Sequence, residues 1–405
     1  MKHLLLSLLL FVLAPHANAF DGPSEQQLAK WLKRFPAADT NGDGKLTAQE
    51  AAAFYQKQRG NNGKRNRGAP STFRVDPGWK ADKFPDHAVC YLAPEEIKLA
   101  YARTLPPNKK AVASYPRPSD GSLRIVGTGH SFMAPGFATF PAISRKAGFD
   151  QPPLVTHTGG GITGSARYKW EQENGIFQFD GNATPKLLAS ISNAEWDAMM
   201  WGPYYQDQPE YYLCWMDFCL KFSPHMKFYV SDAWPQLGQL KELPASEAEL
   251  TSELFARLGK EKNVMTAQLV GDLNKKHPRK AFVMPTSDAM VLAVEYYHQG
   301  KLPGVEGIHR VIGKKERSLW NDHLGHLGPG LGDLEGYVFY ATLYGRSPEL
   351  IEGDFKSNRS SGYPSRELDR TFRKIAWQAV INHPLSGVVD ADNDGVNDRS
   401  ASDKK

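Results

Sequence analysis

The chain has 405 residues, of which 41% are hydrophobic, enough for a sizeable core in two to three domains or in one large domain with smaller ones. The formal net charge of +5 is modest for this length and does not indicate a nucleic-acid partner. Three cysteines do not make a disulfide framework, and the sequence contains no C-x-x-C pair that would indicate zinc.

The first 19 residues are expected to form a cleaved signal peptide. Lys2 precedes an apolar run from Leu4 to Leu13, and residues 17–19 (ANA) have the small-residue pattern of a cleavage site. The run is too short to span a membrane, and no later segment is long and apolar enough. We therefore expect cleavage after Ala19 and a secreted or periplasmic protein without a membrane span. The alternative is an uncleaved anchor.

The segment 39–50, DTNGDGKLTAQE, has the ligand spacing of a calcium loop. Gly44 stands sixth, where such a loop turns sharply, and Glu50 stands twelfth, where a bidentate carboxylate closes the shell. Helical patterns flank the segment, so residues 20–58 resemble a small α-helical EF-hand module. The alternative is a polar turn that binds nothing. The predicted Ca²⁺ ligands are Asp39, Asn41, Asp43, the Lys45 carbonyl, Thr47 and Glu50.

Residues 59–121 are expected to be a linker followed by an irregular arm. The linker begins with the basic run RGNNGKRNR, which is typical of a solvated connection, although it could also contact an anionic polymer. Residues 73–121 are rich in proline and charge and show no clean period.

From residue 122 to residue 384 short apolar runs alternate with helical stretches. This alternation predicts a three-layer α/β domain whose parallel sheet is covered on both faces. In such sheets ligands bind at the carboxyl ends of the strands, so the residues after each run are the candidates for function. The predicted strands are 123–129, 152–158, 196–202, 226–232 and 281–287, and the clearest helical patterns are 246–275 and 287–299.

Two of these strands end in small or glycine-rich segments. The first ends in VGTGHSFM, which places the Ser131 hydroxyl on a tight turn and its N–H where it could bind an oxyanion; a helix cap is the alternative. The second is followed by HTGGGITG (157–164), whose glycines let N–H groups face a substrate, unless the segment is only a flexible loop. No Gly-Lys-Ser/Thr follows, which argues against a nucleotide P-loop.

The third strand ends in WGPYYQDQ, where Tyr204 or Tyr205 supplies a hydrogen-bond donor or packs. The helical segment after it, 209–222, contains Cys214 and Cys219, whose spacing favours burial over a mutual bridge. The pairing of Cys90 stays open.

A fourth candidate site lies in the glycine-rich segment 319–349. Asp322, His323 and His326 stand together just before an apolar helix. A histidine beside a carboxylate is the arrangement of a general base and the group that orients it. The alternatives are a surface loop or a metal site, although the H-E-x-x-H geometry is absent.

Residues 385–405 form an acidic tail. The sequence DADNDGVND resembles the first part of a calcium loop or an acidic calcium-binding repeat, but position twelve is Ala401, so the closing carboxylate is missing. The alternative is a disordered acidic tail. The candidate ligands of this second site are Asp390, Asp392, Asp394 and Asp398.

The order of these segments, with an early serine and a late Asp/His pair, resembles the SGNH (GDSL-like) hydrolase family. The resemblance covers roughly residues 122–350 and implies a flavodoxin-like three-layer sheet. By position it implies that Ser131 is the nucleophile and His326 the base, and that a glycine among 159–161, assigned here to Gly160, lines the oxyanion hole together with the Ser131 N–H.

The chain departs from that family at three positions. The third block should read Gly-x-Asn, but Tyr204 stands where the asparagine is expected. The family's aspartate would fall at position 323, where this chain has His323, so Asp322 takes that role and His323 is an alternative base. His130 replaces the usual aspartate before the serine.

These features predict a secreted, calcium-binding serine ester hydrolase that acts on acyl esters of carbohydrates. The competing hypothesis is a non-catalytic calcium-binding protein whose α/β domain binds carbohydrate or a protein partner. Geometry separates the two, because a hydrolase requires the Ser131 hydroxyl within hydrogen-bond reach of His326 or His323.

Overall fold

The computed structural model describes residues 28–29, 32–33, 35–47, 50–51, 54, 95, 97–99, 115–158, 167–168, 171, 187–202, 209–355 and 362–398. The chain divides into two compact units, one of residues 1–72 with 178–182 and the other of 73–177 with 183–405. The predicted signal peptide, basic linker, Cys90, Gly160 and Tyr204 lie outside the described residues.

The described part of the first unit includes helical residues at 28–29 and 32–33, the short 3-10 helix η1 (Pro36–Ala38), the loop that begins at Asp39, and helical residues at 50–51 and 54. Three side chains are buried, and four larger apolar side chains pack against them; Phe35 and Phe54 face each other with ring centroids 6.1 Å apart. Burial of this small cluster fixes the two ends of the loop relative to each other. The buried residues are Ala38, Leu46 and Ala51, and their neighbours are Leu28, Leu32, Phe35 and Phe54.

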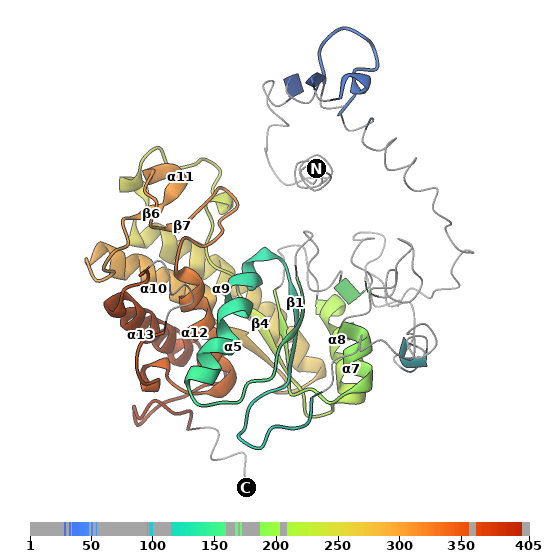
Figure 1. Ribbon diagram of the computed structural model, residues 1–405, viewed down its shortest axis with the longest axis vertical. Coiled ribbons are helices and arrows are strands. Elements are labelled where there is room, and N and C mark those ends of the chain that lie inside the picture. The colour runs from blue at the N-terminus through green and yellow to red at the C-terminus, as the bar shows by residue number, and fades with distance from the viewer. Residues whose placement is uncertain are drawn as a thin grey trace. The chain divides into compact units, whose positions relative to one another are not determined.

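A five-stranded parallel sheet forms the centre of the second unit (Figure 1). Its spatial order is β2-β1-β3-β4-β5, and the register pairs Val126 with Val155 and Ile125 with Ala198. All five predicted strands are present, within the predicted ranges, which confirms an α/β fold with a parallel sheet. The strands are β1 (Ile125–Gly129), β2 (Val155–Thr158), β3 (Ala198–Trp201), β4 (Lys227–Ser231) and β5 (Ala281–Met284).

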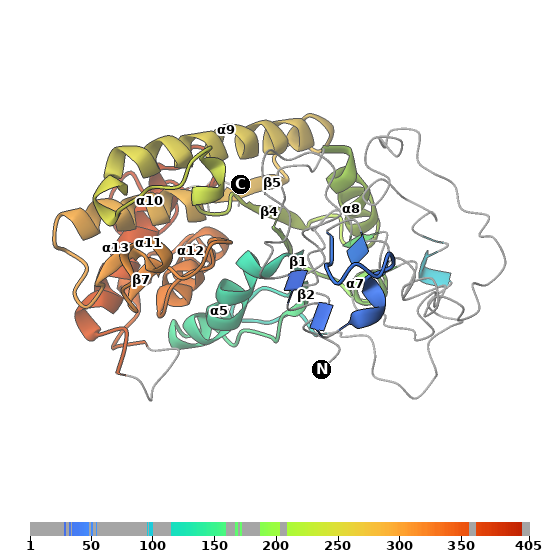
Figure 2. The ribbon, with the colours of Figure 1, turned by 90° about the horizontal axis from the view of Figure 1, so that it is seen from above.

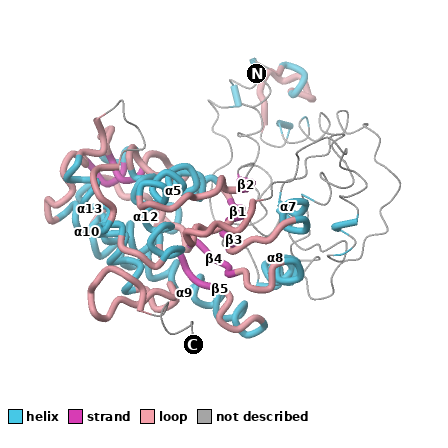
Figure 3. The backbone as a smooth tube through the Cα atoms, turned by 60° about the horizontal axis from the view of Figure 1, so that its bottom comes forward, coloured by secondary structure: helices cyan, strands magenta, loops and turns pink. Residues whose placement is uncertain are grey.

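Helices cover both faces of this sheet (Figure 3). The first face packs against α5 (Ala134–Lys146), α10 (Thr286–His298), α12 (Leu331–Tyr344) and α13 (Arg366–Asn382). The second packs against α7 (Leu187–Asn193) and α8 (Pro209–Phe222). Because each face is covered, the central strands β1 and β3 are buried along their whole length and read as continuous apolar runs.

The long helix α9 (Ser252–Lys276) contributes to both cores, with Phe255 in the first and Val270 and Leu273 in the second. It contacts α10 and α8, and Figure 2 shows it extending from one to the other. Cys214 and Cys219 are buried on α8 and do not form a disulfide with each other, as the sequence predicted.

After α10 the chain forms a small two-stranded parallel sheet, β6 (Gly307–His309) and β7 (Ser318–Trp320), joined by the short helix α11 (Arg310–Gly313). This sheet leads into the glycine-rich segment before α12. Short 3-10 helices complete the connections: η2 (Ser131–Met133), η4 (Leu237–Gln239), η5 (Glu247–Glu249) and η6 (Pro348–Leu350).

Residues 385–398 pack on the second unit. The Val283 N–H donates to the Leu385 carbonyl at 2.9 Å, the Asn397 N–H donates to the Gly345 carbonyl at 2.8 Å, and Val388 is buried. These residues therefore belong to the α/β unit and do not form the disordered acidic tail that their composition allowed. In the part of the chain that the structure describes, no helix is long and apolar enough to cross a bilayer.

Candidate active site

The first half of the site lies where β1 ends. The chain leaves Gly129 through His130, whose Nδ1 accepts the Phe132 N–H at 3.3 Å and so caps η2. Ser131 is the first residue of that helix, and its side chain is exposed. The helix-cap role considered for Ser131 thus belongs to His130, and the Ser131 hydroxyl is directed elsewhere.

The second half of the site is a tight loop after β7. The Asn321 N–H donates to the His326 carbonyl at 2.7 Å, and the Gly325 N–H donates to the Asp322 carbonyl at 2.9 Å. Gly325 has a φ of +87°, in the left-handed region where a side chain is strained, so glycine suits this turn. The loop therefore places the Asp322 and His326 side chains on the same side.

Ser131, His326 and Asp322 form a continuous line of hydrogen bonds. The Ser131 Oγ lies 2.8 Å from His326 Nε2, and His326 Nδ1 lies 2.8 Å from Asp322 Oδ2. The serine and the histidine are 195 residues apart in the sequence, so the fold alone brings them together. The structure thus has the proximity that the hydrolase hypothesis requires.

The surroundings of Asp322 favour its ionised form. Burial opposes ionisation, but hydrogen bonds from the His326 ring and from the His326 and Leu324 N–H groups outweigh it, so the pKa of Asp322 lies below its usual value. An ionised Asp322 can accept a hydrogen bond only from a protonated Nδ1 of His326. In the neutral tautomer with that proton, Nε2 can accept the hydrogen bond of the Ser131 hydroxyl.

The other two interpretations of this loop receive less support. His323 is exposed, and no hydrogen bond in the described residues joins it to Ser131. Both ring nitrogens of His326 are occupied, one by Ser131 and one by Asp322. A metal held by His323 and His326 would have to displace one of these partners.

The predicted oxyanion donors are only partly within the described residues. In that part of the chain the Ser131 N–H donates no hydrogen bond, so it is available at the start of η2. The Gly202 N–H, directly after the neighbouring strand β3, already donates to the Thr128 carbonyl at 3.0 Å. Gly160 and Tyr204 stay predictions, because their positions are outside the described residues.

Two aromatic side chains that the sequence did not indicate, Phe132 and Trp234, lie near His326 and its loop. The Phe132 ring meets the His326 ring edge-on, with centroids 5.3 Å apart, and stacks on Trp234 at 4.8 Å. The Trp234 indole N–H donates to the Gly325 carbonyl at 2.5 Å. Trp234 follows the end of β4, so its place after a predicted strand was the one available signal.

A buried polar cluster at the end of β2 was also missed. His157 Nδ1 lies 2.9 Å from Glu171 Oε1, and Arg167 Nη1 lies 3.2 Å from His157 Nε2. The Glu171 carboxylate also accepts the Leu187 and Leu188 N–H groups at the beginning of α7. The residue that opens the HTGGG segment is therefore anchored to a helix, which a pattern of glycines could not indicate.

The described residues of the segment 39–50 have the conformation of a closed loop. Gly44 has a φ of +76°, and the Asp39 carboxylate accepts the Gly42 and Gly44 N–H groups at 2.7 and 2.9 Å. The Glu50 carboxylate reaches back to the Asn41 N–H at 3.3 Å and to the Thr47 hydroxyl at 2.8 Å. These bonds, first of all the Thr47 N–H, lower the pKa of Glu50 to about 2. The donor set of carboxylate and amide oxygens suits Ca²⁺.

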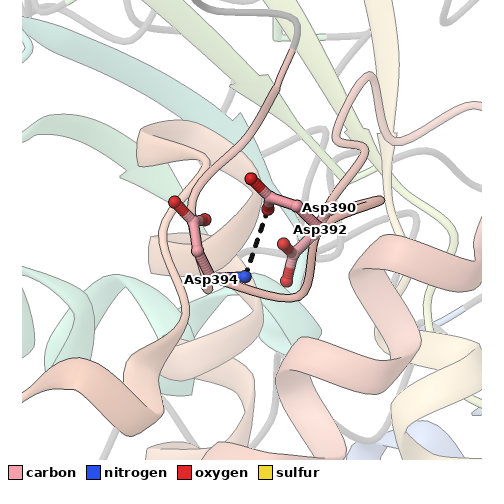
Figure 4. Close-up of side chains that lie close together, drawn as sticks. All are labelled: Asp390, Asp392 and Asp394. Carbon is pink, nitrogen blue, oxygen red and sulfur yellow. Dashed lines mark hydrogen bonds between the residues drawn. The ribbon is translucent and has the colours of Figure 1, made fainter.

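Three of the four acidic residues predicted in the C-terminal segment gather in space (Figure 4). One oxygen each from Asp390, Asp392 and Asp394 lies within 4.8 Å of the others. Asp390 also accepts the Trp377 indole N–H at 3.0 Å, and Asp392 accepts the Asp394 N–H at 3.2 Å. Asp398 is not a member of this group; its carboxylate accepts the Ala391 N–H at 2.6 Å.

Comparisons with known proteins leave the family of this chain open. No family model matches the sequence, and no curated protein matches it. Among solved structures, a DUF4886 family protein from Bacteroides uniformis is similar in part. It shares 9% identity with a TM-score of 0.43, over 64% of this chain and 95% of that one. Function is therefore argued from the geometry of the site.

Proposed function

We propose that this chain is a serine ester hydrolase of the SGNH type. The observation that carries the proposal is the line of hydrogen bonds from Ser131 through His326 to Asp322, with both distances at 2.8 Å. Nucleophile, base and orienting carboxylate in hydrogen-bond contact are the geometric signature of an activated hydroxyl. The resemblance to the SGNH family implies the same roles for Ser131 and His326.

In the proposed reaction the Ser131 Oγ attacks the ester carbonyl while His326 Nε2 takes the hydroxyl proton. The C–O bond to the alcohol then breaks, and His326 returns the proton to the leaving oxygen, which yields the free alcohol and an acyl-Ser131. A water molecule, deprotonated by His326, attacks this acyl group, and the proton returns to Ser131 as the acid leaves. Throughout, Asp322 stabilises the imidazolium.

Negative charge that develops on the carbonyl oxygen needs hydrogen-bond donors. The Ser131 N–H is available for this, and Gly160 and Tyr204 are the further donors that the resemblance implies. The departure from the family at position 323 is compensated locally. The Asp322–Gly325 turn brings an aspartate four residues before the histidine into contact with Nδ1.

The sheet supports the same proposal. The order β2-β1-β3-β4-β5 is the order of flavodoxin-like sheets, in which ligands bind where the chain reverses its direction across the sheet. In this chain that point lies between β1 and β3, and Ser131 follows β1 directly. The Ser131 side chain is exposed, so an ester carried on a large molecule can reach it.

The proposed substrate class is acyl esters of carbohydrates, and the proposed location is outside the cytoplasm. Both rest on the family resemblance and on the leader predicted at residues 1–19. Calcium is proposed as a structural ligand, held by Asp39, Asn41, Asp43, the Lys45 carbonyl, Thr47 and Glu50. A second, weaker site would use Asp390, Asp392 and Asp394. No step of the reaction uses the metal.

The test is release of acetate from acetylated glycans and from aryl acetates. Ser131→Ala is compared with wild type and with Ser252→Ala, a matched loss of a hydroxyl at the first position of α9. We expect activity in the wild type and in the α9 variant and none above background in Ser131→Ala. Equal rates above background in all three proteins would refute Ser131 as the nucleophile, and no activity in any of them would favour the non-catalytic carbohydrate-binding alternative.

A further inference from the structure

We infer that Trp234 is a positioning residue for the catalytic base: its indole N–H holds the Gly325 carbonyl and thereby fixes the loop that presents His326 to Ser131. The inference rests on the proposed hydrolase function and deepens it. Trp234 does not contact the reacting atoms. It acts through the peptide unit next to the base, from a different part of the sheet.

The contact is direct and short. The Trp234 Nε1–H donates to the Gly325 oxygen at 2.5 Å, and Gly325 directly precedes His326 in the chain. Gly325 is buried, and a side chain added at this position would meet Gln236 Cγ at 2.9 Å. The residues that follow β4 therefore enclose the turn of the base loop, and a shift of this peptide would move the imidazole.

Trp234 is itself held firmly in place. Its neighbour Asp232 is buried, and Asp232 Oδ1 accepts the Thr286 hydroxyl and the Ser287 N–H, both at 2.8 Å, at the beginning of α10. Ala233 between them has a φ of +51°, so the chain turns sharply there. The segment that carries the indole is thus tied, through Asp232, to the beginning of α10.

An aromatic contact joins the same indole to the nucleophile side. Phe132, which directly follows Ser131, stacks on Trp234 with an interplanar angle of 21° and meets the His326 ring at 80°. Trp234 therefore contacts both segments whose relative position sets the Ser131–His326 distance. Such support is needed because a misplacement of about 1 Å can reduce a rate by about a hundredfold.

Packing of Trp234 in the core does not by itself require the hydrogen bond from its indole N–H to the Gly325 carbonyl. A second buried tryptophan, Trp201, provides a comparison. Trp201 is fully buried and stacks on Phe228 at 5.0 Å and 20°, close to the geometry of the Trp234 stack. In the described part of the structure, however, Trp201 Nε1 has no hydrogen-bond partner. The two tryptophans are alike in burial and stacking and differ in the N–H contact, so Trp201 is a matched control.

The test replaces each indole by a ring without a donor. In Trp234→Phe we expect kcat on an aryl acetate to fall by about 10- to 100-fold, because His326 is displaced from Ser131. KM should stay within about twofold, because the contacts with the substrate do not change. Trp201→Phe should keep kcat within about threefold of wild type. Equal kcat losses in the two variants, or a rise in KM at unchanged kcat, would overturn the inference.

A second measurement needs no substrate. In proton NMR the His326 Nδ1–H, held by Asp322, should give a low-field signal, assigned by its loss in His326→Gln. We expect Trp234→Phe to broaden or remove this signal and Trp201→Phe to retain it. An unchanged signal in Trp234→Phe would overturn the inference even if hydrolysis were never observed. Failure of Ser131→Ala to reduce hydrolysis would instead refute the proposed function.

Should Trp234→Phe fail to fold, benzothienylalanine at position 234 keeps the bicyclic ring and replaces only the N–H by sulfur. The expected losses in kcat and in the NMR signal are the same as for phenylalanine. Wild-type values in both measurements would overturn the inference.

Discussion

The calcium-like loop at residues 39–50 and the Ser131–His326–Asp322 site are built in opposite ways. Every predicted ligand of the loop lies within twelve consecutive residues, and the glycine turn and closing glutamate are visible in the sequence. The site joins a serine and a histidine that are 195 residues apart. A local site can be recognised from spacing, whereas an assembled one depends on the order of strands in the sheet and on contacts that support it.

The largest effect is expected from a substitution that disables the Ser131–His326–Asp322 site and leaves the loop at 39–50 unchanged. Ser131→Ala should reduce kcat on an aryl acetate by at least about a thousandfold, because the attacking oxygen is removed. Calcium binding, measured by calorimetry, should stay unchanged, because the ligands of the N-terminal loop do not include Ser131. A parallel loss of calcium affinity would contradict the separation of the two regions.

Asp322→Asn should have the next largest effect, a loss of about a thousandfold in kcat at neutral pH. The amide keeps the size of the side chain but no longer stabilises the imidazolium. For comparison, Asp354→Asn removes an exposed carboxylate whose ion-pair partner among the described residues is Arg366, and it should keep the wild-type rate. Equal rates for wild type and Asp322→Asn would show that Asp322 does not orient the base.

The pKa of Asp322 also predicts a pH dependence. The folded value is lowered, so this carboxylate stabilises the folded protein above its unfolded pKa of about 3.9, and that contribution is lost as the pH falls through the folded value. The free energy of unfolding of wild type relative to Asp322→Asn should therefore decrease from pH 6 to pH 3. Denaturant unfolding at both pH values measures this difference, and a constant difference would contradict the ionised state.

Glu50→Gln should disable the loop at 39–50 and leave the Ser131–His326–Asp322 site unchanged. It removes the closing carboxylate, and calcium affinity should fall by at least about tenfold while kcat stays within about twofold of wild type. Asp354→Asn, which removes an exposed carboxylate outside both proposed calcium sites, is the control for a general loss of negative charge. If Glu50→Gln leaves the calcium affinity measured by calorimetry unchanged, the loop at 39–50 is not the calcium site.

The smallest expected effect concerns an anchor of the assembled site. Burial, and then the nearby Asp288, raises the pKa of Asp232 well above its usual value. A raised carboxyl pKa favours the folded state at low pH and destabilises it as the pH rises above about 3.9. Asp232→Asn cannot ionise, so its free energy of unfolding relative to wild type should increase from pH 4 to pH 8. A difference that does not change with pH would contradict the raised pKa.

The sequence was sufficient for the sheet because the strands are short apolar runs separated by clear helical patterns. Ser131 follows a predicted strand and comes directly after β1 and His130, whereas Asp322 follows β7, a strand that the apolar runs did not predict. Beyond the place of Trp234 after a predicted strand, the sequence did not indicate the contacts of Trp234 or Glu171. Their partners lie elsewhere in the chain: Gly325 for Trp234 and the beginning of α7 for Glu171. Their roles depend on tertiary packing, which the hydrophobic periodicity of the sequence does not reveal.

The C-terminal acidic segment shows the same limit in a local motif. Alternate aspartates predicted four ligands, and the structure gathers three of them. Asp398 hydrogen-bonds the Ala391 N–H, because Asn397 and Gly395 tie the end of the segment to Gly345 and Ser347. Tertiary contacts can thus direct a predicted ligand away from the site even when all the predicted ligands are close together in the sequence.

The most direct test of the proposed nucleophile is covalent labelling with a fluorophosphonate, which reacts with activated serines. After digestion, mass spectrometry should find the adduct on the peptide that contains Ser131, with labelling absent in Ser131→Ala and strongly slowed in His326→Gln. No adduct on the wild-type protein, or an adduct only at another serine, would contradict an activated Ser131.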